Sequence, residues 1–393
     1  MLRLPYISHA VCMLALTLVA LAAAPAAAVD IRMGYIQWVP DRGPVLSNII
    51  PEPEDGGLRG AELAVQDNNS TGRFLQQSYS LKTVMADSAE QAVQTLSTMM
   101  DQGIELFVLN VPATTLRTMA ATAGDKVLLF NAGAKDDALR ISECSPNTLH
   151  TIASYSMLTD ALAQWLNSRR WNDIFLITGP TDQDIQWAEG FRRASKRFNL
   201  DIVTEKPWTF DGDLRRTASK ELPLFTQGAD YDAVVVADVR GDFGEYVPYN
   251  TWLPRPVIGT QGLTPVTWHR VVEAWGAAQL QSRFRDLADR GMNDLDYAGW
   301  IAVRSIGEAV TRAGSPASGD VRAYVLSDQF QLDGFKGRKL SYRSWNGQLR
   351  QPIPLVHPRA LVAQTPIEGF LHPKTDLDTL GYDAPESTCR ISR

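Results

Sequence analysis

The chain has few cysteines, no excess of positive charge and no recognisable catalytic motif. Three cysteines in 393 residues exclude a disulfide-dense scaffold. There are 38 Lys and Arg residues against 44 Asp and Glu residues, and this net charge of -6 argues against nucleic acid as a partner, because proteins that bind it need a basic face. The G-x-S-x-G nucleophile elbow, the phosphate-binding G-x-x-x-x-G-K-[ST] loop and the H-E-x-x-H zinc motif are all missing from the sequence. We therefore do not expect an enzyme.

Candidate metal ligands are equally sparse. None of the five histidines has a histidine partner three or four residues away, including the four beyond residue 28: His150, His269, His357 and His372. Hydrogen-bonded or surface histidines are favoured over zinc ligands for this reason. The neighbouring acids Asp136 and Asp137, and the pair Asp182 and Asp184, are better explained as solvated loop acids or helix caps than as an acid–base pair. We expect no resident metal and no cofactor.

Residues 1–28 have the features of a cleavable export signal. Arg3 supplies a positive start, Val11 to Ala24 form an apolar run, and Ala26 to Ala28 offer a small-residue cleavage site. The run has about 14 residues, and a membrane-spanning helix needs roughly 20. We therefore expect cleavage after Ala28 and a mature protein that is soluble outside the cytoplasm.

The cysteine count becomes even when this signal is removed. Cys12 leaves with the signal, while Cys144 and Cys389 remain. In an oxidising compartment these two favour one disulfide over two free thiols. The bond would close a loop of about 245 residues and tie the C-terminal tail back to the middle of the chain, as a structural clamp.

Hydrophobic periodicity predicts two successive α/β units. Strands are expected at 31–36, 79–85, 106–109 and 127–130, with helices at 58–69, 89–102 and 114–123. The same alternation then restarts, with strands at 173–178, 200–204, 233–237 and 257–259 and helices at 152–167, 182–198 and 214–224. Further helices are expected at 266–274, 279–290, 295–313 and 321–326, then strands at 339–342 and 353–356 and an irregular tail beyond 363. This order predicts an α/β fold of two Rossmann-like lobes, with parallel sheets flanked by helices and several chain crossings between them.

The loops that follow the strands form the candidate binding site, because open parallel sheets bind ligands at the carboxyl ends of their strands. In the first unit these loops are 37–42, 110–115 and 131–136, and in the second they are 179–183, 238–242 and 260–262. Thr114 and Thr115 open a helix whose free N–H groups suit an anion or a carbonyl oxygen. Two lobes placed face to face would bring all these loops to one cleft.

Four short motifs follow one another in a familiar order. They are Gly57 to Ala64 with Asn68 and Asn69, Ala132 to Ala134 with Leu139, Ser145 to Thr151, and Tyr297 to Trp300 with Ala302 and Val303. In this order they resemble the first helix, the fourth strand and loop, the first lobe crossing and the late helix of the type I periplasmic solute-binding proteins. These are the branched-chain amino-acid-binding class of ABC transporter receptors. The resemblance implies a periplasmic location, with lobe 1 at 29–147 plus about 280–330, lobe 2 at 148–279 plus about 336–360, and a tail at 361–393 that returns to the hinge.

A narrower resemblance concerns three other stretches. Asp67 to Phe74, Gly276 to Leu280 and Asp294 to Tyr297 are similar to the subgroup associated with pyrroloquinoline quinone (PQQ)-dependent alcohol dehydrogenase systems. This resemblance implies a link to alcohol oxidation and leaves the ligand open.

The expected ligand contacts differ from those of amino-acid receptors. Eleven residues in the strand-end loops are the candidates: Trp38, Ala113, Thr114, Thr115, Ala134, Lys135, Asp182, Gln183, Asp238, Arg240 and Gln261. Gln261 occupies the position of the family's ammonium-binding acid, and a neutral amide cannot balance an ammonium. Lys135 and Arg240 instead indicate an anionic ligand, unless both are solvated rim charges. Trp38 either stacks on a planar ligand such as PQQ or packs under its loop.

The resemblance implies a monomeric receptor that captures a small organic molecule by hinge closure and delivers it to an inner-membrane ABC permease. The alternative is a sensor or a PQQ carrier, whose closed form docks on a membrane kinase or a dehydrogenase. Neighbouring permease genes would favour transport, and a neighbouring kinase alone would favour sensing.

Overall fold

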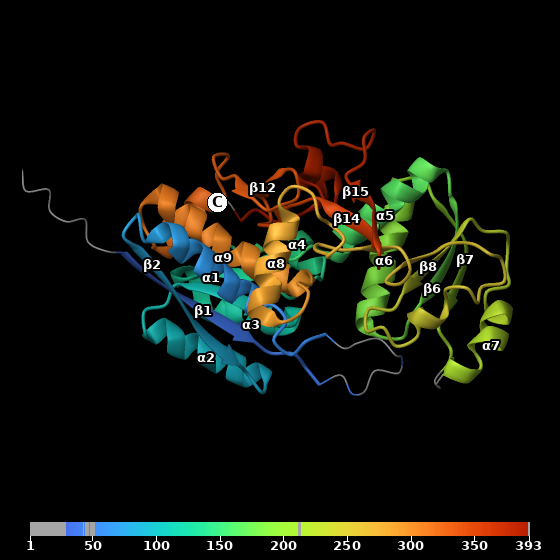
Figure 1. Ribbon diagram of the computed structural model, residues 1–393, viewed down its shortest axis with the longest axis horizontal. Coiled ribbons are helices and arrows are strands. Elements are labelled where there is room, and N and C mark those ends of the chain that lie inside the picture. Colours follow the sequence, from blue (N-terminus) through green and yellow to red (C-terminus); the bar gives the residue numbers. More distant parts are fainter. Residues whose placement is uncertain (1–28, 42, 44–46, 48–51, 211–213, 392–393) are drawn as a thin grey trace, which may run out of the picture.

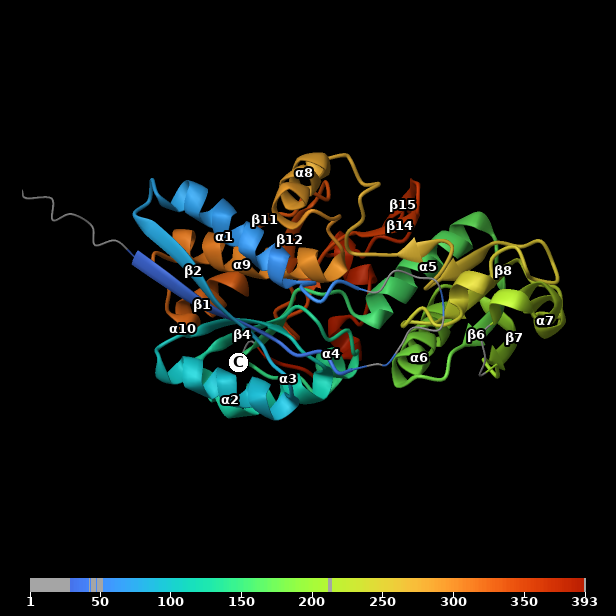
Figure 2. The same cartoon turned by 60° about the horizontal axis from the view of Figure 1, so that its bottom comes forward.

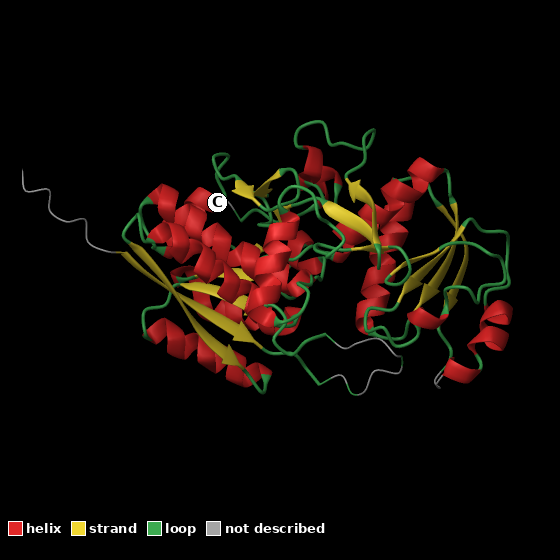
Figure 3. Ribbon diagram, in the orientation of Figure 1, coloured by secondary structure: helices red, strands yellow, loops and turns green. Residues whose placement is uncertain are grey.

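The structure, a computed structural model, describes residues 29–41, 43, 47, 52–210 and 214–391 (Figure 3). The predicted export signal, with Cys12, lies outside the described residues. Within the described part of the chain, every helix is too short or too polar to cross a bilayer.

A five-stranded parallel sheet in the order β2-β1-β3-β4-β5 forms the first α/β unit, which we call lobe 1 (Figure 1). Its strands are β1 (Val29–Gln37), β2 (Gln77–Met85), β3 (Leu106–Asn110), β4 (Leu128–Asn131) and β5 (Thr148–His150). Its helices are α1 (Leu58–Gly72), α2 (Ala89–Asp101), α3 (Ala113–Ala123), η1 (Gly124–Lys126), α4 (Ala138–Ile141), α8 (Ala277–Ala288), α9 (Asp294–Ala313) and α10 (Ser318–Val325). Helices α2 and α3 pack on one face of the sheet, and α1, α9 and α10 pack on the other. The central strands β3 and β4 are buried throughout, as parallel strands covered on both faces must be.

A four-stranded parallel sheet in the order β7-β6-β8-β9 forms the second unit, lobe 2. Its strands are β6 (Asp173–Thr178), β7 (Asp201–Pro207), β8 (Ala233–Ala237) and β9 (Val257–Gly259). Its helices are α5 (Tyr155–Arg169), α6 (Asp182–Arg197), η2 (Leu214–Arg216), α7 (Ala218–Phe225) and η3 (Gly244–Tyr246). Helices α5 and α6 cover one face, and α7 covers the other. The two lobes lie side by side along the long axis of the molecule in both views (Figure 2).

Two small antiparallel sheets occupy the junction between the lobes. The sheet of β11 (Leu332–Asp333), β12 (Lys339–Tyr342) and β13 (Leu349–Arg350) adds Leu332, Leu340 and Leu349 to the lobe 1 core. The sheet of β10 (Thr264–Pro265), β14 (Ile353–His357) and β15 (Ala360–Thr365) adds Ile353 and Leu355 to the lobe 2 core. The chain therefore crosses between the lobes after β5, after β10 and after β13. Beyond β15, only the short helices η4 (Asp376–Thr379) and η5 (Ala384–Glu386) interrupt an irregular tail.

The segment 266–274 is not the helix that the sequence predicts. The N–H groups of Thr267 and Trp268 both donate to Asp294 Oδ1, at 2.8 and 2.9 Å, and the Trp268 indole donates to Gln281. These bonds wrap the segment around the start of α9 in an extended and turned path. Trp268 and Val272 are still buried in the lobe 1 core, which explains why their spacing resembles that of an amphipathic helix.

Candidate functional site

The carboxyl end of the lobe 1 sheet faces lobe 2. The loop after β1 reaches lobe 2, where the Ser47 hydroxyl donates to the carbonyl of Gly241 in the loop after β8. The loop after β4 touches the start of α5, because the Lys135 carbonyl accepts a bond from the Tyr155 N–H at 3.0 Å. Loops that follow the strands of both sheets are therefore brought together, at the position where open α/β sheets bind ligands.

In lobe 1, the start of α3 is open. Pro112 is its N-cap and makes no side-chain cap bond, so no side chain from that position covers the first N–H groups. Of the predicted residues here, Ala113 is half-buried, Thr114 is exposed and Thr115 is buried. Trp38 follows β1, donates its N–H to the Asn110 carbonyl at 3.0 Å and is half-buried against the α2/α3 side of the core. The indole is therefore covered in part by the lobe 1 core and accessible in part.

The loop after β4 is held by its own first residue. The Asn131 amide donates to the Ala134 carbonyl at 2.8 Å and accepts from the Ala134 N–H at 2.9 Å, which fixes the turn that presents Lys135. The Lys135 ammonium lies 3.7 Å from Asp294 Oδ2, with side chains 24% and 18% exposed. Lys135 is thus partly accessible, and its partner is an acid at the first position of α9.

In lobe 2, an acid closes the start of α6. Asp184 Oδ2 accepts from the Thr181 N–H at 3.0 Å in a capping box, which agrees with the helix-cap interpretation of the sequence. Its Oδ1 accepts from the Val239 N–H at 2.6 Å, so one carboxylate joins the loops after β6 and β8. Of the predicted ligand residues beside it, Asp182 is exposed and Gln183 is half-buried.

The loop after β8 is organised around Asp238. Its Oδ1 accepts from the Asp242 N–H at 2.9 Å, and its Oδ2 accepts from the Phe243 and Gly244 N–H groups at 2.8 and 2.6 Å. Burial raises the pKa of Asp238, and these three N–H donors oppose that effect. The carboxylate is therefore occupied in shaping the loop. Arg240 lies on the same loop, with its Nε 3.3 Å from Asp242 Oδ2 and its side chain 23% exposed.

Gln261 follows β9 and is half-buried against the same loop. A Cβ atom added to Gly244 would lie 2.5 Å from Gln261 Cγ, so the two residues are in close contact. The predicted residues therefore form two sets, one at the strand ends of each lobe. Two surface hollows, of about 560 and 420 Å³, lie elsewhere and are lined by other residues.

Two acids matter here more than sequence reasoning foresaw. Asp294 is the partner of Lys135, and Asp184 links two loops of lobe 2. Asp184 is the capping-box acid of Thr-Asp-Gln-Asp, in line with the helix-cap interpretation of the sequence, whereas in Asn-Asp-Leu-Asp the capping-box acid is Asp296 and Asp294 is the first helical residue. The distant partners of Asp184 and Asp294 depend on tertiary structure, which no local pattern contains.

The described residues include no cluster of three or more His, Cys, Asp or Glu side chains suited to a metal ion. His150 is buried, its Nδ1 lies 3.0 Å from Asn131 Nδ2, and burial lowers its pKa well below the usual value. It is a structural, hydrogen-bonded histidine beside the loop that carries Lys135.

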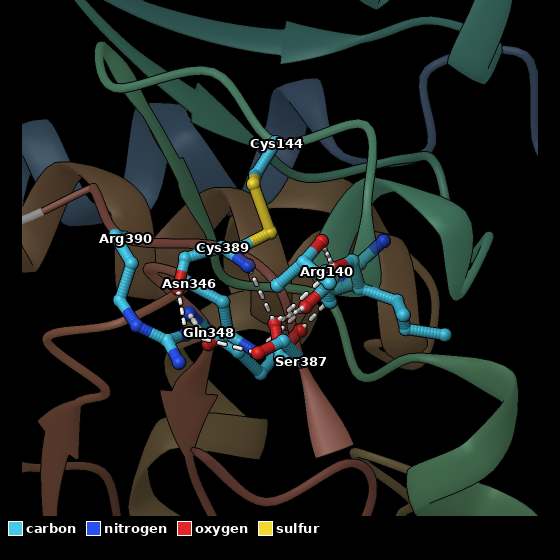
Figure 4. Close-up of a disulfide and its surroundings, with 9 residues drawn as sticks. Arg140, Cys144, Asn346, Gln348, Ser387, Cys389 and Arg390 are labelled. Atoms are coloured by element: carbon cyan, nitrogen blue, oxygen red, sulfur yellow. Dashed lines mark hydrogen bonds between the residues drawn. A yellow bond between two sulfur atoms is a disulfide. The ribbon is translucent and has the colours of Figure 1, made fainter. Parts of the chain in front are cut away.

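The structure contains the predicted disulfide between Cys144 and Cys389, with the two Cα atoms 5.9 Å apart (Figure 4). Cys389 is buried, and Cys144 packs against the lobe 1 core. The bond therefore attaches the end of the chain to lobe 1.

The chain is similar to known proteins in sequence and in fold. Residues 50–243 match the family model described as periplasmic binding protein. No curated protein sequence matches the chain. Among solved structures, a branched-chain amino acid ABC transporter periplasmic ligand-binding protein from Burkholderia xenovorans has a TM-score of 0.74 at 15% identity, over 92% of this chain and 100% of that one.

Two further structures are similar. A periplasmic binding protein from Burkholderia mallei has a TM-score of 0.67 at 17% identity, over 93% of this chain and 99% of that one. An ABC transporter solute-binding protein from R. palustris, in complex with benzoate, has a TM-score of 0.62 at 14% identity, over 84% and 93%. At such identities the likeness establishes the fold. The chain therefore has the fold of the type I periplasmic binding proteins, and its residues 50–243 match the periplasmic binding protein family model.

Proposed function

We propose that the chain is a periplasmic solute-binding protein that captures a small organic molecule between its lobes and delivers it to an ABC permease. The observation that carries this proposal is the meeting of strand-end loops from both lobes, seen in the Ser47–Gly241 hydrogen bond. Ligand would bind first to one set of loops and then be enclosed as the other lobe rotates. The rotation would occur at the three crossings, near 151–154, 266–267 and 351–352.

The solute is proposed to be an organic anion. Lys135 and Arg240 stand one in each lobe, and each is partly exposed and loosely paired with an acid, at 3.7 and 3.3 Å. A carboxylate that enters between the lobes would take up these cations more tightly than such pairs do, because charge-assisted bonds shorten and strengthen away from water. Gln261 supplies an amide where an ammonium group would need an acid. The solved relatives include complexes with benzoate and with leucine, so both compounds belong in a test.

The link to PQQ-dependent alcohol oxidation rests on the sequence resemblance alone. PQQ is a planar molecule with several carboxylates. Lys135 and Arg240, which we propose bind an organic anion, would suit these carboxylates as well. We therefore propose it as one member of the ligand panel.

The test is native mass spectrometry of freshly purified mature protein, followed by calorimetric titration with benzoate, PQQ, leucine and a neutral aromatic alcohol. We expect a co-purified small molecule, or binding of an anion at micromolar concentration, and no binding of the alcohol. Binding of leucine alone would overturn the anion proposal. The solute-binding function would be contradicted if the protein is purified without a bound small molecule and binds no compound of the panel, although its circular dichroism spectrum shows that it is folded.

A further inference from the structure

The irregular C-terminal tail holds both lobes at once. Residues 376–391, which we call the strap, follow the last strand and lie over the junction between the lobes (Figure 1). Leu380 is buried in the core of lobe 2, whereas Ile391 is buried in the core of lobe 1. A single short segment thus contributes an apolar side chain to each core.

The contacts of the strap with lobe 2, which we call the lobe 2 grip, are centred on a buried acid. Asp160 on α5 is fully buried, and its Oδ2 accepts from the Gly381 N–H at 2.7 Å. The Gly381 carbonyl accepts from Arg193 and Arg197 on α6, at 3.1 and 2.9 Å. The same two arginines pair with Asp160 at 3.0 Å, so helix and strap share one network. A network of this kind is costly to break because its members are desolvated.

The contacts of the strap with lobe 1, which we call the lobe 1 grip, include a covalent bond. The Cys389 sulfur is bonded to Cys144, and the Ser387 hydroxyl donates to the Arg140 carbonyl at 2.8 Å (Figure 4). The Thr388 N–H and hydroxyl both donate to the Ile141 carbonyl, at 2.8 and 2.7 Å. Arg322 on α10 donates to the Ile391 carbonyl. Every one of these partners belongs to lobe 1.

The junction itself is held by a third set of contacts. Asp378 Oδ1 accepts from Arg343 and Arg350, both at 2.8 Å, and Arg343 also donates to the Leu380 carbonyl at 2.6 Å. Arg343 and Arg350 lie in the segment that connects the two lobes. The strap is therefore fixed at both ends and in the middle.

The distance between the two grips is short. Five residues lie between Gly381 and Ser387, and the six steps from one Cα atom to the next limit their separation to roughly 20 Å even for a fully extended chain. We infer that the strap limits how far the lobes rotate about their crossings, so that the opening of the binding site is set by residues 376–391 and by the Cys144–Cys389 bond. This inference deepens the proposed function by naming a control on the same site, and it can be tested without any ligand.

The experiment measures the distance between the lobes in the full-length mature protein. Spin labels are attached through a non-cysteine handle at two exposed positions, Thr118 on α3 and Lys220 on α7, which leaves the disulfide intact. A site-specific protease sequence is inserted between Ala384 and Pro385, within the strap. The matched control has the same insertion between Glu368 and Gly369, in an exposed loop before the strap.

Cleavage at 384/385 cuts the backbone between the two grips after folding is complete and leaves only side-chain contacts such as the Arg193–Glu386 ion pair across the cut. Cleavage at 368/369 leaves both grips joined through the strap. We expect the distance distribution between the labels to widen at least about 1.5-fold after the first cut and to keep its width after the second. An unchanged width after the first cut, or equal widening after both, would overturn the inference.

A point variant gives a second, independent measurement if the insertion prevents folding. Asp160→Asn keeps the size of the side chain and weakens the grip on Gly381. Its control, Glu205→Gln on β7, removes a carboxylate that pairs with Arg192 on α6 and that no contact above joins to the strap. Widening in Asp160→Asn and not in Glu205→Gln is expected, and the same distribution in both contradicts the strap as a limit. Solute binding by the uncut protein is assayed separately. The proposed solute-binding function and the proposed limit on lobe rotation can therefore be contradicted independently of each other.

Discussion

At the scale of single residues, the two partly exposed cations at the strand ends matter more for a ligand than for the fold. Lys135 and Arg240 are each about three-quarters buried, and each has an acid at long ion-pair distance. Loose pairs of this kind contribute little to stability. Their removal should therefore affect ligand binding far more than folding.

We predict that Lys135→Ala and Arg240→Ala each weaken binding of the native solute by about tenfold or more, the effect of losing one charge-assisted bond. The free energy of unfolding should change by less than about 1 kcal/mol. The measurement is calorimetric titration with the compound found by native mass spectrometry, and Arg192→Ala, on the surface of α6, is the control. Unchanged affinity in both variants would identify the pair as rim charges.

A buried lysine gives a prediction in pH. Lys336 is 1% exposed, donates to Gln351 Oε1 and the Pro352 carbonyl at 2.7 and 3.1 Å, and burial lowers its pKa to about 7. In the unfolded chain the same group titrates near its usual value of about 10.4. Between these values the unfolded chain binds the proton more tightly, so stability falls as the pH is lowered from about 10 to 7.

We therefore predict that wild-type protein gains about 3 kcal/mol of unfolding free energy between pH 7 and 9.5 relative to Lys336→Met, which has no group to titrate there. Urea denaturation at the two pH values measures this difference. If the two proteins respond in parallel, the lysine is charged in the folded state, held by its two acceptors and the Tyr297 ring 4.5 Å away.

At the scale of elements, α1 and α9 owe their close approach to glycine. A Cβ atom on Gly60 would lie 1.7 Å from the Asp296 carbonyl oxygen, and one on Gly299 would lie 2.4 Å from the Gly57 carbonyl oxygen. Backbone atoms cannot move aside as a flexible side chain can, so the helices would have to separate. Two of the four family-like motifs contain these glycines, and this contact is their physical basis.

Gly60→Ala is predicted to cost at least about 2 kcal/mol of unfolding free energy, at the upper end of overpacking substitutions. Gly319→Ala is the matched control, because a Cβ atom there meets nothing within 4 Å on helix α10. The control should be neutral or stabilising by up to about 1 kcal/mol. Thermal and urea denaturation of both variants test this, and equal effects would show that α1 and α9 separate without cost.

The sequence predicts the bounds of helices and strands well where the buried residues recur with a clear helical or strand period. The strands at 173–178, 233–237 and 257–259 are found at the predicted residues, and α2, α6 and α9 differ at an end by one residue. Five of the described strands are absent from the prediction: Thr148–His150, Thr264–Pro265, Leu332–Asp333, Leu349–Arg350 and Ala360–Thr365. Thr148–His150 is only three residues long, and Ala360–Thr365 runs into the tail that was expected to be irregular beyond 363. In both, pairing with another strand supplies the hydrogen bonds: Thr148–His150 pairs with β4, and Ala360–Thr365 forms a hairpin with β14.

The candidate site was likewise predictable in its local features and not in its long-range contacts. The loops were located from the rule that ligands bind beyond strand ends, and the capping role of Asp184 follows from its spacing to Thr181. The Lys135–Asp294 pair and the bond from Val239 to Asp184 join residues remote in sequence. Such contacts exist only after the crossings have brought the segments together.

At the scale of the whole molecule, the Cys144–Cys389 bond closes almost two-thirds of the chain. The separation is 245 residues, for which the loop-entropy model gives a stabilisation on the order of 5 kcal/mol, an upper figure. We predict that Cys144→Ala with Cys389→Ala lowers the unfolding free energy by about 2–5 kcal/mol. Urea denaturation measures the loss, and intact mass before and after reduction verifies the bond in wild type. Equal stability of the two proteins would contradict this prediction.

The packing of α1 on α9 has a consequence for how the protein is made. Lobe 1 draws its main core from Ile31 through to Ile391, whereas most of the lobe 2 core comes from the continuous stretch between Ala153 and Leu263. While the chain emerges from the ribosome, the first 150 residues have no α9 to pack against until residue 313 has been added. Contacts so distant in sequence form slowly. The leading part of the chain, its first 150 residues, therefore remains incompletely folded while the stretch that forms lobe 2 folds. A leading part whose main core is completed late can still be threaded through a narrow pore.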